Sequence, residues 1–116
     1  MVECHFLIPL RRDAEIADGE PHDLKDWDWL ELQIQHLFGF WTVAPGYYHG
    51  AWMSPRTGQL ITDQSRRFIL ALPENDIDSL RNLLKLVCRV FSQQCVYLAI
   101  AGKVEFVEPE NYGQEF

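Results

Sequence analysis

Three successive segments between residue 67 and Gly102 constrain the fold most, because they predict a strand, a helix and a second strand. Residues 67–72 form a short apolar run that Pro73 ends, which is typical of a buried strand. In residues 76–93 apolar side chains recur every three or four positions, the period of one helix face. Residues 95–100 are again apolar and predict a strand, which Gly102 ends. We therefore expect a strand–helix–strand unit to organise the domain.

The first third of the chain predicts a strand over 2–10, a polar loop over 11–22 and a helix that Asp23 begins and Gly39 ends. Alternation along the strand places His5 on the face opposite Phe6. The expected inner face of the helix consists of Leu24, Trp27, Leu30, Ile34 and Leu37 or Phe38.

Between the two units, residues 40–44 predict a short strand, and residues 46–62 predict a hairpin arm between two turns that contain proline and glycine. The order of elements predicts an α+β protein with a ferredoxin-like βαββαβ plait. Its antiparallel four-stranded sheet has both helices on one face, with the arm as an addition. We expect residues 1–107 to form this single domain and residues 108–116 to form an acidic, frayed tail.

The chain carries a net charge of −7, and nine acidic residues against three basic ones lie within its first 38 positions. An acidic protein gains nothing from the release of phosphate counterions, so nucleic-acid binding is disfavoured. The acidic third serves either as a solvated face or as a docking surface, over residues 13–31, for a basic partner.

No apolar run approaches the length of a membrane span, and the N-terminus lacks the pattern of a signal peptide. Three cysteines, an odd number, favour reduced thiols. We therefore expect a cytoplasmic protein with no membrane partner.

Short motifs add a resemblance. The spacing of Trp52, Gly58, Asp63 and Ser65, followed by a strand, a helix and the segment FSQQCVY over 91–97, resembles small uncharacterised bacterial proteins with a ferredoxin-like plait. The resemblance covers residues 40–106 and implies a fold but no reaction, because that family has no established activity. Some of those proteins are exported, whereas this chain lacks a signal.

Candidate binding residues combine aromatic, basic and imidazole groups. The segment from Gly46 to Trp52 is rich in Tyr, His and Trp, which bind planar or polar ligands but also cover a core as an edge strand. Adjacent arginines at 66 and 67 either hold an anion or pair with Asp63 or with the acidic first helix. The candidate ligand-binding residues are Tyr48, His49, Trp52, Arg66, Arg67 and Tyr97.

No cysteine or histidine pair has the spacing of a metal site, and no glycine-rich loop follows a strand to bind a dinucleotide. We therefore expect no cofactor and no metal. His5 is the candidate catalytic residue, since a histidine on a partly buried sheet face exchanges protons near neutral pH; the alternative is a packed, hydrogen-bonded histidine.

The leading functional hypothesis is a binding or assembly module that forms a homodimer through the open sheet face. Leu7, Ile69, Ala71 and Ala99 are expected to expose an apolar patch there that a second copy, another protein or a small-molecule ligand covers. The alternatives are a small plait-type enzyme, with His5 as the proton-transfer residue for a small aromatic or carboxylate substrate, and an acidic inhibitor or adaptor.

Overall fold

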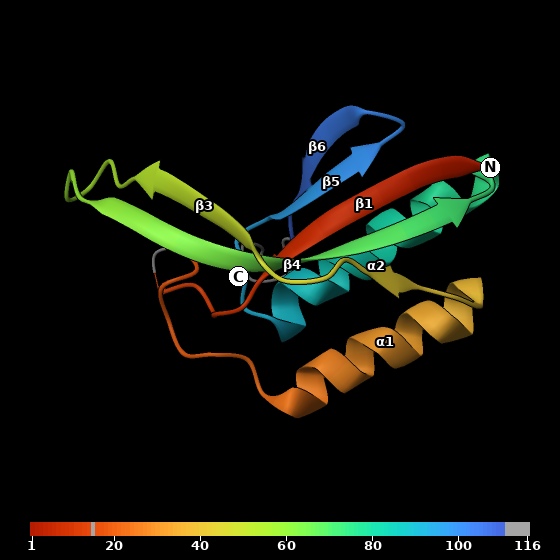
Figure 1. The fold of residues 1–116 in the computed structure, drawn as a ribbon, viewed down its shortest axis with the longest axis horizontal. Helices are drawn as coiled ribbons and strands as arrows, with labels where there is room; N and C mark the ends of the chain where they lie inside the picture. Colours follow the sequence, from red (N-terminus) through yellow and green to blue (C-terminus); the bar gives the residue numbers. More distant parts are fainter. Residues whose placement is uncertain (15, 111–116) are drawn as a thin grey trace.

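The computed structural model of the protein describes residues 1–14 and 16–110. The chain forms an α+β domain in which an antiparallel sheet of six strands packs against two α-helices (Figure 1). The elements in chain order are β1 Val2–Pro9, α1 Leu24–Phe38, β2 Thr42–Val43, β3 Tyr48–Met53, β4 Leu60–Leu72, the 3-10 helix η1 Glu74–Asp76, α2 Ile77–Val90, β5 Val96–Ile100 and β6 Lys103–Val107.

The strand order is β2-β4-β1-β5-β6, and β3 pairs with the outer half of β4. β1 lies inside the sheet, between β4 and β5. The sheet has six strands instead of the predicted four, because β3 of the arm pairs with β4 and β6 pairs with β5. The second half of the arm and the strand expected over 67–72 form one continuous strand, β4. The predicted arm is therefore the β3–β4 hairpin, an extension of the same sheet that projects beyond both helices (Figure 1).

Both helices cover one face of the sheet, and the core lies between these layers (Figure 1). Alternation along β1 buries Cys4, Phe6 and Ile8, and it places His5 on the opposite face, as predicted. From α1 come Leu30 and Ile34, whereas α2 contributes a wider stripe that comprises Ile77, Leu80, Leu83, Leu84, Val87 and Cys88.

The predicted inner face of α1 was partly wrong. Leu24 is 75% exposed, because it lies at the first position of the helix. Of the two alternatives at the other end, Leu37 is 46% exposed, whereas Phe38 packs against the core, as Trp27 does. Asp23 and Asp76 occupy the N-cap positions, but neither side chain makes a capping hydrogen bond. Gly39 ends α1 with a φ of 87°, a left-handed conformation that suits glycine.

Residues 108–110 follow β6, and the rest of the predicted tail, residues 111–116, lies outside the described residues. In the described part of the chain, no helix is both long and apolar enough to cross a membrane.

Candidate functional site

The face of the sheet opposite the helices carries a cluster of polar and aromatic side chains, defined by His5, Tyr48, Arg67 and Tyr97. Arg67 donates a hydrogen bond from Nε to His5 Nδ1 at 3.1 Å and a second from Nη1 to the Tyr48 hydroxyl at 3.1 Å. The Tyr97 ring lies 5.9 Å from the His5 ring, centroid to centroid. Four of the seven residues predicted from the sequence therefore lie side by side on β1, β3, β4 and β5.

The protonation state of His5 follows from these contacts. Its Nδ1 accepts the Arg67 N–H, so the proton of the neutral ring is assigned to Nε2. Burial, followed by the positive charge of Arg67, lowers the pKa of His5 from its ordinary value, while Glu3 opposes this shift. His5 is therefore neutral at pH 7, and its basic nitrogen is already occupied by Arg67.

The other three predicted residues lie elsewhere. Arg66 reaches the helix side of the sheet, where its guanidinium carbon is 4.7 Å from the centroid of the Trp27 ring in α1. The exposed His49 has its Nδ1 3.5 Å from Gln64 Nε2 in the arm. Trp52 is half-buried beside Ile61, and its indole N–H is buried with no acceptor among the residues that the structure describes.

A cavity of about 150 Å³ opens at the end of this face, where the loop over 11–22 approaches the strands. Leu7, Tyr97 and Phe106 supply apolar and aromatic walls, and Asp63 supplies a carboxylate. A second cavity, of about 420 Å³, lies between the same loop and the arm, and it shares Ala17 and Asp63 with the first. Asp63 therefore lies where the two cavities meet.

Asp63 was not among the binding residues predicted from the sequence. Its carboxylate makes no ion pair or hydrogen bond within residues 1–14 and 16–110, and pairing with Arg66 or Arg67 does not occur. Its cross-strand partner is Gly50, and a Cβ atom at position 50 would collide with Asp63 Oδ1. Glycine at this position thus leaves the space that the carboxylate occupies.

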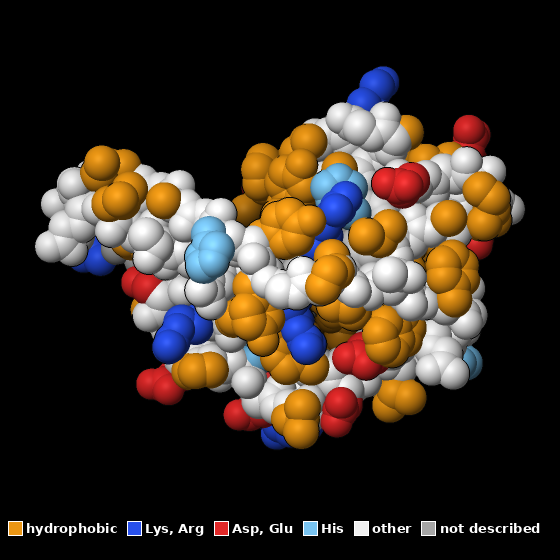
Figure 2. All heavy atoms as spheres, in the orientation of Figure 1, with side chains coloured by type: hydrophobic (Ala, Val, Ile, Leu, Met, Phe, Trp, Pro, Cys, Tyr) orange, Lys and Arg blue, Asp and Glu red, His pale blue; other side chains and the backbone are white. Residues whose placement is uncertain are grey.

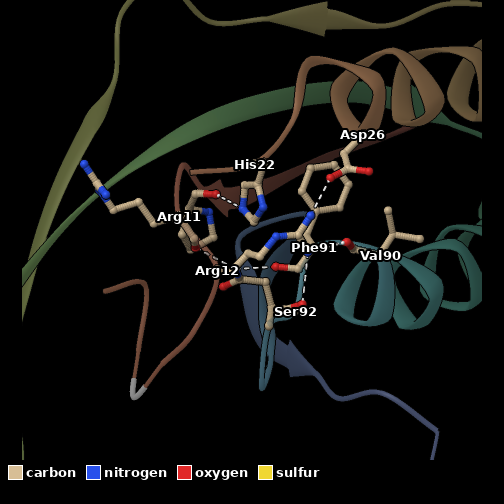
Figure 3. A network of polar contacts seen from close by, with 9 residues as sticks. Arg11, Arg12, His22, Asp26, Val90, Phe91 and Ser92 are labelled. Atoms are coloured by element: carbon tan, nitrogen blue, oxygen red, sulfur yellow. Dashed lines mark hydrogen bonds and ion pairs between the residues drawn. The ribbon is translucent and has the colours of Figure 1, made fainter. Parts of the chain in front are cut away.

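The loop over 11–22 is held against both helices. Arg12 donates to Asp26 Oδ2 of α1 at 2.8 Å, and to the Val90 carbonyl and Ser92 Oγ at the end of α2, each at 3.1 Å (Figure 3). Beside it, His22 is 8% exposed, and its Nε2 lies 2.8 Å from the Pro9 carbonyl (Figure 3). These contacts fix the loop that closes one end of the cavity.

Asp13 in the same loop already uses both carboxylate oxygens. Oδ1 accepts from the Ala17 N–H at 2.5 Å, and Oδ2 accepts from the Gln94 N–H at 2.6 Å. Asp13 therefore shapes the cavity, whereas Asp63 remains able to bind a ligand. Within residues 1–14 and 16–110, no three acidic, histidine or cysteine residues gather as a metal site requires.

The apolar part of the open face differs from the prediction. Ala99 is 2% exposed, because its small side chain lies between its larger neighbours His5 and Val104, and Leu7, Ile69 and Ala71 are half-buried. The exposed apolar residues of this face lie on the edge strand β6: Val104 is 52% exposed and Phe106 is 63% exposed. Hydrophobic side chains also gather at the end of the arm, where Met53 and Leu60 are exposed (Figure 2).

No protein-family model and no curated protein matches the sequence. Among solved structures, the chain is similar to a phage SAM lyase in complex with S-methyl-5'-thioadenosine, with a TM-score of 0.67 and 20% identity, covering 96% of this chain and 92% of that chain. The apo state of phage SAM lyase gives a TM-score of 0.65 at 20% identity, with 96% and 91% covered. CutA from Pyrococcus horikoshii gives a TM-score of 0.52 at 8% identity, covering 99% of this chain and 90% of that chain. At these identities, the likeness shows a shared fold.

Proposed function

We propose that this protein is a small enzyme that binds S-adenosylmethionine (SAM) or a related adenosyl sulfonium compound at the cavities beside Asp63. The observation that carries the proposal is the unpaired carboxylate of Asp63 next to a cavity walled by Tyr97 and Phe106. A fold by itself transfers no activity, so the likeness to phage SAM lyase only directs attention to this ligand.

The chemistry of the site suits an adenosyl sulfonium compound. Its adenine is planar and packs against aromatic rings, and its sulfonium is a cation that is attracted by a carboxylate and by aromatic faces. Pockets for ligands of this size measure about 300–1,000 Å³, so the smaller cavity alone is too small. We infer that the ligand extends past Asp63 from one cavity into the other, because both include this residue. The proposed reaction cleaves the bond between the sulfonium sulfur and Cγ of the amino-acid chain. An oxygen of the ligand's own carboxylate attacks Cγ and closes a lactone, while the electron pair of the broken bond leaves with the sulfur as neutral S-methyl-5'-thioadenosine.

The first test replaces the carboxylate. We expect Asp63→Asn to weaken SAM binding by about 10- to 100-fold, the range for loss of a charge-assisted contact, and to abolish release of S-methyl-5'-thioadenosine. Calorimetric titration measures the affinity, and chromatography of the reaction mixture measures the product. Gly50→Ala should weaken binding as well, because the new methyl group displaces Asp63.

The control for this test is Asp28→Asn, which changes the charge equally at an exposed position on α1. A wild-type protein that binds neither SAM nor S-methyl-5'-thioadenosine contradicts the proposed ligand. Unchanged affinity in Asp63→Asn contradicts the proposed site.

A second proposal is self-association, because β6 is an edge strand that exposes Val104 and Phe106 on the open face. We propose that two copies cover this strip as a homodimer. Phe106→Glu should weaken the association roughly 30-fold, the effect of losing about 2 kcal/mol at an apolar contact. Light scattering over a range of concentrations measures it, with Leu86→Glu on α2 as the exposed control. A wild-type protein that is monomeric at every concentration contradicts the homodimer.

The arrangement of the fold, the cellular location and the acidic docking surface complete the proposal. We propose that the α+β domain is a ferredoxin-like plait over residues 1–107, with β3 and β6 as additions, and that the protein is cytoplasmic. Docking of residues 13–31 on a basic partner receives less support, since Asp13 and Asp26 are already bound within the chain.

A further inference from the structure

The guanidinium of Arg67 carries a positive charge that no acidic group in residues 1–14 and 16–110 pairs with. Its two hydrogen-bond partners, the His5 imidazole and the Tyr48 hydroxyl, are neutral groups. The Tyr48 ring also lies beside the guanidinium, with the central carbon 5.7 Å from the ring centroid. Arg67 is half-buried, so its charge is only partly solvated and an anionic ligand stabilises it.

The two neutral partners fix the orientation of the guanidinium but leave N–H groups free to bind an anion. A guanidinium has five N–H bonds, and His5 and Tyr48 accept two of them. Both N–H bonds of Nη2 and one of Nη1 remain, which suffices for a two-point contact with a carboxylate. Because the side chain is already held, such a contact loses little side-chain entropy.

We propose that Arg67 binds the carboxylate of the ligand on the open sheet face, and that His5 is a positioning residue that holds the guanidinium. The ligand therefore carries an amino-acid group in addition to its nucleoside. The identity of that ligand as SAM rests on the proposed function, whereas the carboxylate site rests on the geometry of Arg67.

The positions of Arg67 and Asp63 suit a ligand with charges of both signs. The two residues belong to β4 and are four positions apart, so alternation places them on the same face. At about 3.3 Å per residue, their Cα atoms are roughly 13 Å apart. Both side chains extend from these Cα atoms over the same face, so one small molecule can place its anionic group at Arg67 and its cationic group at Asp63.

The role of His5 differs from the proton transfer expected from the sequence. Its Nδ1 accepts the Nε–H of Arg67, so this nitrogen takes a proton from a substrate only if Arg67 moves. The His5 ring instead holds the guanidinium of Arg67 in one orientation, in the way that hydrogen bonds from neighbouring residues hold the ligand-binding side chains of many sites.

The decisive measurement compares two ligands that differ by one carboxylate, SAM and decarboxylated S-adenosylmethionine. We expect Arg67→Gln to lower the affinity for SAM by about 10- to 100-fold and to change the affinity for the decarboxylated compound by less than about 3-fold. The matched control is Arg66→Gln, which removes the neighbouring charge from the helix side. Equal effects of Arg67→Gln on both ligands, or no effect on either, overturn the proposal.

Two His5 variants separate positioning from general packing. Asparagine retains an acceptor close to the position of Nδ1, whereas leucine has none. We expect His5→Asn to retain the SAM affinity within about 3-fold and His5→Leu to reproduce the loss in Arg67→Gln. Equal losses in both variants overturn the positioning role.

A third measurement works without a nucleoside, so it separates failure of this site from failure of the proposed function. The Arg67 Nε–H signal, assigned through its loss in Arg67→Gln, is followed by ¹⁵N NMR while sodium acetate is added at constant ionic strength against sodium chloride. A saturable shift with acetate supports a carboxylate site even if the wild-type protein binds neither adenosyl compound. A response equal to that of chloride overturns the site.

Discussion

Replacement of Phe68 by alanine is expected to reduce the free energy of unfolding by about 3–5 kcal/mol. Phe68 is 0% exposed, and its ring stacks on Phe6 of the neighbouring strand with centroids 5.1 Å apart and an interplanar angle of 6°. The two residues face each other across the β1–β4 pair, in the layer that both helices cover. Truncation thus removes a ring from the centre of the core and leaves a cavity that rigid strands cannot close.

Chemical denaturation followed by tryptophan fluorescence measures this loss. Domains of this size are stable by about 5–15 kcal/mol, so the variant loses a large fraction of its stability. Phe40→Ala is the control, because Phe40 is 44% exposed between α1 and β2 and its loss should cost less than about 1 kcal/mol. Similar losses in the two variants contradict the assignment of the core.

The alternation of side chains along a strand predicted much of the site. His5 follows Cys4 and precedes Phe6, so it had to face away from the core, and the structure places it there. The same rule separates the adjacent arginines, because Phe68 points inward and Arg67 must then point outward. Arg66 and Arg67 were equal candidates for anion binding, although their positions in the strand already distinguish them.

Other features depend on contacts that alternation does not predict. The continuity of β4 from Leu60 to Leu72 follows from pairing with β3 at one end and with β1 at the other. The role of Asp63 follows from the register that places Gly50 opposite it. Neither register is fixed by a local pattern, since both join segments that are distant along the chain or separated by a turn.

The contacts of the loop over 11–22 could not be predicted from the sequence either. Arg12 lies 78 residues from Val90, whose carbonyl it binds, and the polar composition of the loop suggested only an irregular connection. The loop is instead the segment that joins the ends of both helices to the open face.

The free energy of unfolding is expected to fall as the pH decreases from 7 toward 5, in large part because of His22. Burial lowers the pKa of His22 from its ordinary value, and Arg12 acts in the same direction, whereas the hydrogen bond to Pro9 and the carboxylates of Asp26 and Asp13 raise it. The ring lies edge-on to Trp27 and Phe91, with centroids 5.5 Å and 4.8 Å away. Its Nδ1 is buried with no partner among the described residues, so a proton added there has no acceptor nearby.

The direction of the effect follows from proton linkage. Because the folded pKa is lower than the unfolded one, the unfolded chain binds more protons as the pH falls below about 6.5. Stability is therefore present above the unfolded pKa and is lost as the pH falls through the folded pKa. Each such group contributes a slope of at most about 1.4 kcal/mol per pH unit. His5, whose pKa is lowered as well, adds a contribution of the same sign.

His22→Gln isolates the contribution of the buried ring. The glutamine amide can donate to the Pro9 carbonyl in place of the His22 Nε2–H but does not titrate, so the variant should show a shallower decline of stability between pH 7 and pH 5. Denaturation at a series of pH values measures the slopes, and His36→Gln, at an exposed position on α1, serves as the control. If the free energy of unfolding of His22→Gln declines with pH as steeply as that of the wild-type protein, then the unpaired Nδ1 is not the group that links stability to pH.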